Sequence, residues 1–220
     1  MSLWQDYLSN TGRPIGKWAH YFPIYERHLS SKRNQELVLL EIGVAGGGSG
    51  QMWSKFLGPR ATIVGIDIDE NCAMHDGLAV RIRIGDQSDK NFLAEIIKEF
   101  GIPDVVIDDG SHQMNHIKAS FEFLYPQMQK NSIYIIEDLH TAYWPNYGGG
   151  IENPDTFINY SKNSIDKLNE RWIPANTKTL NQVVDNTFSI NFYDSVVVYE
   201  KGGVKWHEAP VVGRGYSEPF

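Results

Sequence analysis

Short runs of apolar and β-branched residues recur along the first two thirds of the chain, at 37–42, 62–67, 80–84, 104–107 and 132–136. Runs of this kind are typical of strands that are buried on both faces. Polar stretches with a helical period separate several of them, at about 50–57, 89–100 and 112–124. Strands that alternate with helices predict a parallel sheet with right-handed crossovers.

The end of this pattern differs from its beginning. Two further apolar runs, 187–192 and 195–200, are separated by Tyr193 and Asp194, a spacing that predicts a hairpin. We therefore expect an α/β fold. Its Rossmann-like, mostly parallel, seven-stranded sheet would carry helices on both faces and end in a C-terminal antiparallel hairpin.

Two regions lie outside the alternation. Residues 1–33 are expected to form an N-terminal cover segment with a helix around 22–29. Residues 139–186 are polar and aromatic, with a helix expected near 155–171, and would form an insertion or lid between strands. With 220 residues, 41% of them hydrophobic, the chain is long enough for one sizeable core, so we expect a single domain over 1–220.

The composition narrows the possible partners. Twenty basic and 27 acidic side chains give a net charge of −7 without a long basic run, which argues against nucleic acid as a partner. A single cysteine, Cys72, excludes an internal disulfide framework and favours a reducing cytoplasm. No signal-peptide pattern or membrane-length apolar window is evident. We expect a cytoplasmic protein without a membrane partner.

Acidic pairs follow two of the predicted strands: Asp108-Asp109 and Glu137-Asp138. Burying a carboxylate is costly unless it is paired or binds a metal. In open α/β sheets, ligands bind outside the carboxyl ends of the strands. The two pairs therefore indicate a cation site and a reaction. There are alternatives to a cation site. Asp109 could cap the following helix, and Glu137 and Asp138 could be ordinary polar residues at a strand end.

The turn after the first predicted strand is rich in glycine, and no register of it matches the G-x-G-x-x-G pattern of dinucleotide folds. An acidic residue, Glu41, precedes Gly43 by two positions, which suits the cationic amino group of a methionine moiety. Polar groups also end the next two strands. Together they predict an S-adenosylmethionine site made of Glu41, Gly43, Gly47, Ser49, Asp67, Asp86 and Gln87, with Asp67 on the ribose hydroxyls and the Asp86-Gln87 pair at the adenine.

These motifs resemble those of class I S-adenosylmethionine-dependent methyltransferases. A closer resemblance is to the metal-dependent sugar O-methyltransferases that tailor macrolide antibiotics, of the mycinamicin and macrocin type. It is carried by the motifs at 107–112 and 136–138, by Thr141 to Pro145, and by Lys17-Trp18-x-His20-Tyr21 and Tyr25-Glu26. The resemblance covers almost the whole chain. It departs from the family before Lys17, where residues 12–16 replace an expected acidic residue.

The resemblance implies a role for each residue of the acidic motifs. Asp109, Glu137 and Asp138 would bind Mg²⁺ or another divalent cation, and His112 would be the general base. Strand alternation directs Asp108 away from Asp109, towards the cofactor or a backbone amide. A zinc pair of His112 and His116 is the alternative for the histidines, and His140 is expected in solvent.

Tyr143 and Trp144 are candidates for contact with the acceptor, because aromatic faces stack on sugar rings; packing against 155–171 is the alternative. We expect an S-adenosylmethionine- and metal-dependent O-methyltransferase acting on a hydroxyl of a sugar-containing small molecule, in a possible homo-oligomer. Alternatives are a catechol-type O-methyltransferase, a nicotinamide-dependent sugar-modifying enzyme and a non-catalytic cofactor-binding protein.

Overall fold

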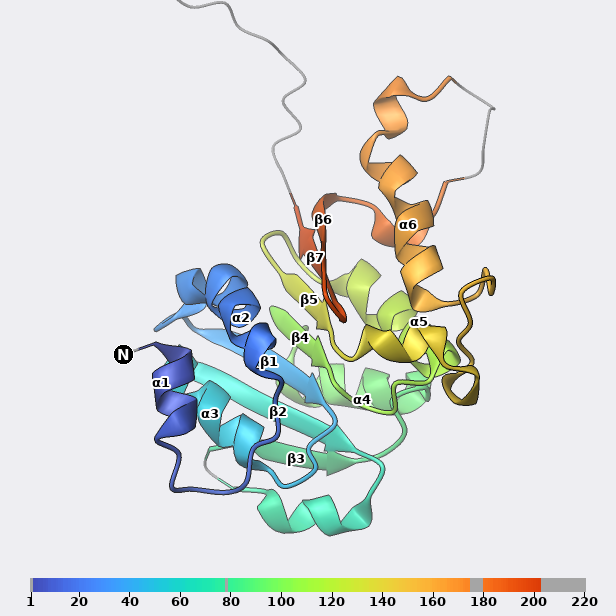
Figure 1. The fold of residues 1–220 in the computed structure, drawn as a ribbon. Coiled ribbons are helices and arrows are strands. Elements are labelled where there is room, and N and C mark those ends of the chain that lie inside the picture. Colours follow the sequence, from blue (N-terminus) through green and yellow to red (C-terminus); the bar gives the residue numbers. More distant parts are fainter. Residues whose placement is uncertain (1, 78, 175–179, 203–220) are drawn as a thin grey trace, which may run out of the picture.

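The computed structural model describes residues 2–77, 79–174 and 180–202, and in them the predicted α/β fold is confirmed (Figure 1). A seven-stranded sheet has the order β3-β2-β1-β4-β5-β7-β6. Its strands are β1 (Leu37–Ile42), β2 (Ala61–Asp67), β3 (Arg81–Ile84), β4 (Val105–Asp108), β5 (Ile133–Ile136), β6 (Thr187–Tyr193) and β7 (Val196–Lys201). The first five strands are parallel, and β7 runs antiparallel to both β5 and β6.

Helices cover both faces of the sheet (Figure 1). One face carries α1 (Leu3–Leu8), α2 (Phe22–Leu29) and α3 (Gly48–Leu57); the other carries α4 (Lys90–Phe100), α5 (Met114–Leu124) and α6 (Phe157–Leu168). Short 3-10 helices in the connections are η1 (Ala19–Tyr21), η2 (Ser30–Lys32), η3 (Glu70–His75), η4 (Tyr125–Gln127), η5 (Leu139–Tyr143), η6 (Pro145–Tyr147), η7 (Glu170–Trp172) and η8 (Gln182–Val184). Among the described residues, no helix has the length and apolar character needed to cross a membrane.

Strand alternation divides the core into two halves. In the buried strands, Leu39, Ile107 and Ile135 face the α1–α3 layer, whereas Leu40 and Ile136 face the α4–α6 layer. Each central strand therefore has apolar residues at nearly every position, because both of its faces are covered.

Local signals end the helices close to the predicted positions. The Asp89 side chain caps α4 by accepting a hydrogen bond from Asn91 N at 2.8 Å, and Gly101 ends that helix with a φ of 92°. α6 ends earlier than predicted, at Leu168, and the C-cap is Asn169. The hairpin turn lies one residue later than predicted: β6 continues through Tyr193, and Ser195 takes the left-handed turn conformation with a φ of 62°.

The sheet brings three chain connections together at one edge. β1 lies next to β4, and β4 lies next to β5. The ladder continues just past the strands, since Asp109 N donates to Ile42 O and Glu137 N donates to Asp108 O, each at 2.9 Å. The strand order reverses between β1 and β4, which is where open α/β sheets bind their ligands.

Candidate functional site

A cleft of about 430 Å³ lies at the carboxyl ends of β1, β2, β3 and β4. We call it the glycine cleft. Residues 14–17 of the N-terminal segment form one part of its lining. The rest of the lining comes from the ends of the strands and the loops that follow them: 42–46, 48 and 49 at β1, 66–68 at β2, 85–87 at β3, and 109–112 with His116 at β4. Gly43 has a φ of 91°, and a methyl group on it would overlap the Asp109 carbonyl group. The loops after β1 and β4 can therefore approach this closely only with glycine at this position.

Asp67 shapes the wall of the glycine cleft. Its Oδ2 accepts hydrogen bonds from Val44 N at 2.8 Å and Ala45 N at 3.1 Å, and its Oδ1 accepts from Asp69 N at 2.9 Å. Burial would raise the pKa of Asp67, but these backbone donors lower it below its usual value. Asp86 also lines the cleft, and its Oδ1 accepts from Ser88 N at 2.7 Å.

Three predicted cofactor residues do not line the glycine cleft: Glu41, Gly47 and Asp108. Neighbouring side chains enclose the two carboxylates. Glu41 is 2% exposed and accepts from Ser49 Oγ at 2.7 Å and Trp53 Nε1 at 3.1 Å. Gly47 immediately precedes α3, outside the lining of the cleft. Asp108 is 1% exposed and accepts from Ser120 Oγ at 2.8 Å and Gln87 Nε2 at 3.0 Å. Burial raises the pKa of both carboxylates.

Gln87 joins the loops at the β3 and β4 ends. While its Nε2 donates to Asp108, its Oε1 accepts from Ser111 N at 2.8 Å. Asp108 thus acts on the glycine cleft through Gln87 and lies on the α5 side of the sheet, as its even position in β4 requires. Asp109, one residue later, points to the opposite side and lines the cleft.

A second cavity, of about 330 Å³, adjoins the glycine cleft and shares Gly16, Lys17 and Asp109 with it. We call it the acidic pocket. Asp109, Glu137 and Asp138 line it together with residues 16–19 and Tyr21. The three predicted metal ligands therefore do meet in one cavity, as their positions at neighbouring strand ends suggested.

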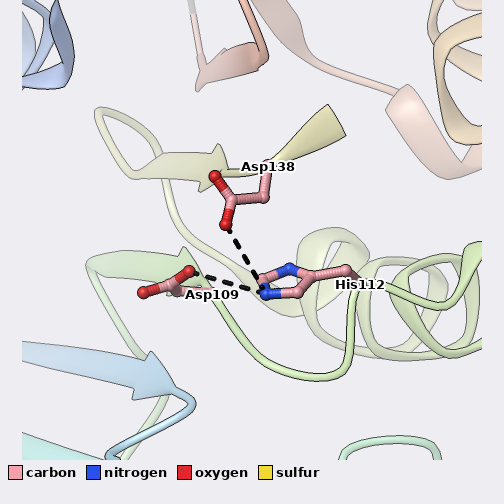
Figure 2. Close-up of side chains that lie close together, drawn as sticks. All are labelled: Asp109, His112 and Asp138. Atoms are coloured by element: carbon pink, nitrogen blue, oxygen red, sulfur yellow. Dashed lines mark ion pairs between the residues drawn. The ribbon is translucent and has the colours of Figure 1, made fainter. Parts of the chain in front are cut away.

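Most oxygens of these three carboxylates already have protein donors. Glu137 accepts from Tyr25 Oη at 2.7 Å and from Lys17 Nζ at 2.9 Å. Asp109 Oδ2 accepts from Lys17 Nζ at 2.6 Å, and Asp138 Oδ1 accepts from Tyr21 Oη at 2.5 Å. The remaining oxygens are Asp109 Oδ1 and Asp138 Oδ2, and both face His112 (Figure 2).

His112 completes a group with the two aspartates. Its Nε2 lies 3.6 Å from Asp138 Oδ2 and 4.0 Å from Asp109 Oδ1, and one ligand atom from each of the three residues lies within 4.8 Å of the others. His112 and Asp138 have positive φ angles of 57° and 54°. Non-glycine residues rarely adopt this conformation, and it is concentrated at functional sites. Here it turns both side chains into the group shown in Figure 2.

Burial and the Lys17–Glu137 ion pair have opposite effects on the pKa values of Glu137 and Lys17 in the acidic pocket. Burial raises the pKa of Glu137 above its usual value, and Asp109 adds to this, whereas Lys17 opposes it. For Lys17, burial alone would lower the pKa, but Glu137, Asp109 and Glu41 raise it well above its usual value. The ammonium of Lys17 is thus a stable positive charge inside the acidic pocket.

Aromatic rings lie near the acidic pocket, and one of them, Trp18, lines it. Trp18 and Trp144 are 57% and 49% exposed, and the His140 ring lies between them, 6.3 Å from Trp18 and 4.8 Å from Trp144 by ring centroids. The His140 Nδ1 is 4.0 Å from Asp138 Oδ1. Tyr143 is half exposed on the same 3-10 helix as His140. We call the row formed by Trp18, His140 and Trp144 the aromatic rim.

Several side chains of the site were not predicted from the sequence. Lys17, Tyr21 and Tyr25 were noted only as parts of a motif, yet they hold the acidic side chains from a segment far away in the sequence. The tyrosine spacing of four residues around α2, which places both rings on one helix face, was the available signal. His112 and His116, considered as a possible zinc pair, both line the glycine cleft. Their ring nitrogens have different neighbours: His116 Nδ1 lies 3.1 Å from Ser111 Oγ, whereas His112 Nε2 lies near Asp109 and Asp138.

Most of this chain aligns with curated relatives that are named for their activity. It is 38% identical over 197 residues to the mycinamicin VI 2''-O-methyltransferase of Micromonospora griseorubida and 34% identical over 200 residues to the demethylmacrocin O-methyltransferase of Streptomyces fradiae. Each alignment covers 84% of this chain, and 49% and 50% of the respective relatives. The chain therefore spans about half the length of the curated relatives it matches. No protein-family model matches it.

Solved structures agree with the sequence comparison. The MycE methyltransferase of the mycinamycin biosynthetic pathway, in complex with Mg and SAH, superimposes with a TM-score of 0.80 at 36% identity, over 91% of this chain and 53% of that one. A complex of the same enzyme with Mg, SAH and mycinamycin VI gives a TM-score of 0.79. The resemblance inferred from the motifs is confirmed: the homologues of this chain are sugar O-methyltransferases.

Proposed function

We propose that this chain is an S-adenosylmethionine-dependent, divalent-metal-dependent O-methyltransferase that acts on a hydroxyl of a sugar or a glycosylated natural product. One observation carries the proposal: the glycine cleft and the acidic pocket share Asp109, so a methyl donor and a cation-bound acceptor would meet at one residue. The homology to sugar O-methyltransferases supports this assignment.

The donor set of the acidic pocket suits a hard divalent ion. Asp109 Oδ1 and Asp138 Oδ2 lie beside each other, and Glu137 is next in the chain. Carboxylate oxygens are preferred by Mg²⁺, which keeps several exchangeable positions for water or substrate. We assign Asp109 and Asp138 as direct ligands, with Glu137 as the third ligand expected from the family motif.

The proposed chemistry is an in-line methyl transfer. The sulfonium would supply the methyl group, and the bound ion would lower the pKa of the acceptor hydroxyl. His112 Nε2 would take the hydroxyl proton, since it lies beside both open aspartate oxygens. On the donor side, Asp67 and Asp86 at the glycine cleft would hold the ribose and the adenine, and Ser49 would lie near the methionine end.

The aromatic rim favours a sugar acceptor. Trp144, with Tyr143 beside it, would cover one face of the sugar ring, and the neighbouring Trp18 is exposed in the same row. MycE has been solved in complex with mycinamycin VI, and the relative from Streptomyces fradiae is named for demethylmacrocin. Glycosylated molecules of this kind are therefore the first acceptors to test. A cytoplasmic location and assembly into a homo-oligomer belong to the same proposal.

The proposal is tested by methyl transfer to a panel of glycosylated acceptors before and after exhaustive chelation. We expect chelation to abolish turnover and added Mg²⁺ to restore it, because the acceptor hydroxyl then loses and regains its acidifying ion. Full activity after chelation would contradict the metal requirement. Transfer to flat catechols in preference to sugars would favour the catechol-type alternative.

A further inference from the structure

Lys17 occupies an unusual place for a lysine. It belongs to no helix or strand, yet its side chain is only 3% exposed. Its Nζ lies 2.6 Å from Asp109, 2.9 Å from Glu137 and 3.6 Å from Glu41. These carboxylates come from the ends of β4, β5 and β1, so one ammonium joins three neighbouring strand ends.

The segment that carries Lys17 is held against the sheet edge at a second place. Arg13 Nη1 donates to His75 O at 3.0 Å, and Arg13 N donates to Gln51 Oε1 at 3.2 Å. A methyl group on Gly48 would lie 2.6 Å from Arg13 O, so the segment rests directly on the first turn of α3. Residues 14–17 between these two anchors form one wall of the glycine cleft.

Lys17 also lines the acidic pocket, together with Gly16 and Asp109. A molecule in the glycine cleft would contact the 14–17 wall, whereas an ion in the acidic pocket would contact Asp109. The Lys17–Asp109 pair connects these two events, because it fixes the wall and one carboxylate oxygen at the same time. A ligand that displaces the wall would therefore also displace this carboxylate oxygen, and a ligand that holds one would hold the other.

We propose that Lys17 is a positioning residue that couples cofactor binding in the glycine cleft to divalent-ion binding in the acidic pocket. The inference rests on the proposed function and deepens it, since it makes the two sites thermodynamically dependent on each other. Coupling between two sites is reciprocal: the factor by which one ligand strengthens the other must be the same in both directions.

The test is calorimetric and needs no turnover. The Kd of Mg²⁺ is measured with and without saturating S-adenosylhomocysteine, and the Kd of S-adenosylhomocysteine with and without Mg²⁺. For the unsubstituted protein we expect both ratios to agree at about five-fold or more. In Lys17→Met, which keeps the length of the side chain without its charge, both ratios should fall close to one.

Two further variants sharpen the test. Lys17→Arg retains the charge, but a planar guanidinium cannot contact the three carboxylates as an ammonium does. The ratio of the two Kd values should therefore lie between that of the unsubstituted protein and one. This variant also serves if Lys17→Met fails to fold. Lys55→Met is the matched control, because Lys55 is 65% exposed and pairs with Asp6 on the surface. Its ratio should equal that of the unsubstituted protein.

The outcomes separate coupling from simple charge competition. If Lys17 only repelled the ion, Lys17→Met would bind Mg²⁺ more tightly by the same factor with and without S-adenosylhomocysteine, and the unchanged ratio would overturn the inference. A ratio of one in the unsubstituted protein would also overturn it. Binding of neither ligand to that protein would contradict the proposed function and the inference together.

Discussion

At the scale of single residues, His112 has two possible roles that the geometry brings close together. Its Nε2 lies near Asp109 Oδ1 and Asp138 Oδ2, where it could take a proton from the acceptor or bind the ion itself. The two roles differ in what the ring nitrogen must do during the reaction. A base is needed for the chemical step, whereas a ligand is needed before it.

We predict that His112→Asn lowers kcat by about 10²- to 10⁴-fold, as expected for loss of a general base. The Kd of Mg²⁺, measured by calorimetry, should change little. The comparison variant is His140→Asn, in the aromatic rim, which should raise the acceptor KM more than it lowers kcat. Near-normal kcat of His112→Asn between pH 6 and 9 would exclude the base role, and a large loss of Mg²⁺ affinity would make His112 a ligand.

Only some of the acidic residues had an environment that could be predicted from the sequence. Asp108 and Asp109 could be separated in advance, because side chains alternate along a strand and only one of two neighbours can face the acidic pocket. The environment of Glu137 could not be predicted. Its partners Lys17 and Tyr25 lie 120 and 112 positions away in the sequence, and only the packing of α2 and of the segment before it on the sheet brings them together.

At the scale of elements, the strands and most of the longer helices were predictable because their signals are local, whereas α1 was not predicted. The buried β-branched runs predicted the strands, and the helical period over 89–100 predicted α4 to within one residue. The course of residues 13–18 was not predictable, because it depends on single contacts such as that of Arg13 with His75. The position of the loop after β1 could be predicted from the sequence. Its shape could not, because it depends on hydrogen bonds to Asp67 in the next strand.

Asp67 therefore gives a prediction at the element scale. The folded-state pKa of this carboxylate is lowered, so its stabilising effect is fully present above the unfolded value of about 3.9 and is lost as pH falls through the folded value. Asp67→Asn should destabilise the protein by about 1 kcal/mol near neutral pH, a modest figure because the side chain is partly exposed. The difference should shrink below about pH 4.

Urea unfolding at pH 7, 5, 4 and 3 measures this difference. The control is Asp89→Asn, because asparagine caps a helix as well as aspartate does, and its stability should match that of the unsubstituted protein at neutral pH. A difference between Asp67→Asn and the unsubstituted protein that stays constant down to pH 3 would show that the carboxylate charge is not what fixes the loop after β1.

At the scale of the whole molecule, the loops that form the glycine cleft come from both halves of the sheet. Val44 and Asp67 lie on the β1–β2 side, whereas Gly110 and Ser111 follow β4, so a cofactor would contact parts of the fold that are otherwise joined through the sheet. Any molecule that binds the folded state and not the unfolded chain stabilises the former by mass action.

We predict that S-adenosylhomocysteine at 100 times its Kd stabilises the protein by about 2.7 kcal/mol. For a chain of this size that corresponds to a rise in Tm of roughly 5–11 °C. NAD⁺ at the same concentration should leave Tm unchanged, because the turn after β1 lacks the glycine pattern that holds a pyrophosphate. A larger shift with NAD⁺ would favour the nicotinamide-dependent alternative. A shift with S-adenosylhomocysteine but no methyl transfer to any sugar would indicate a binding protein, since the same cleft would then bind the cofactor without using it.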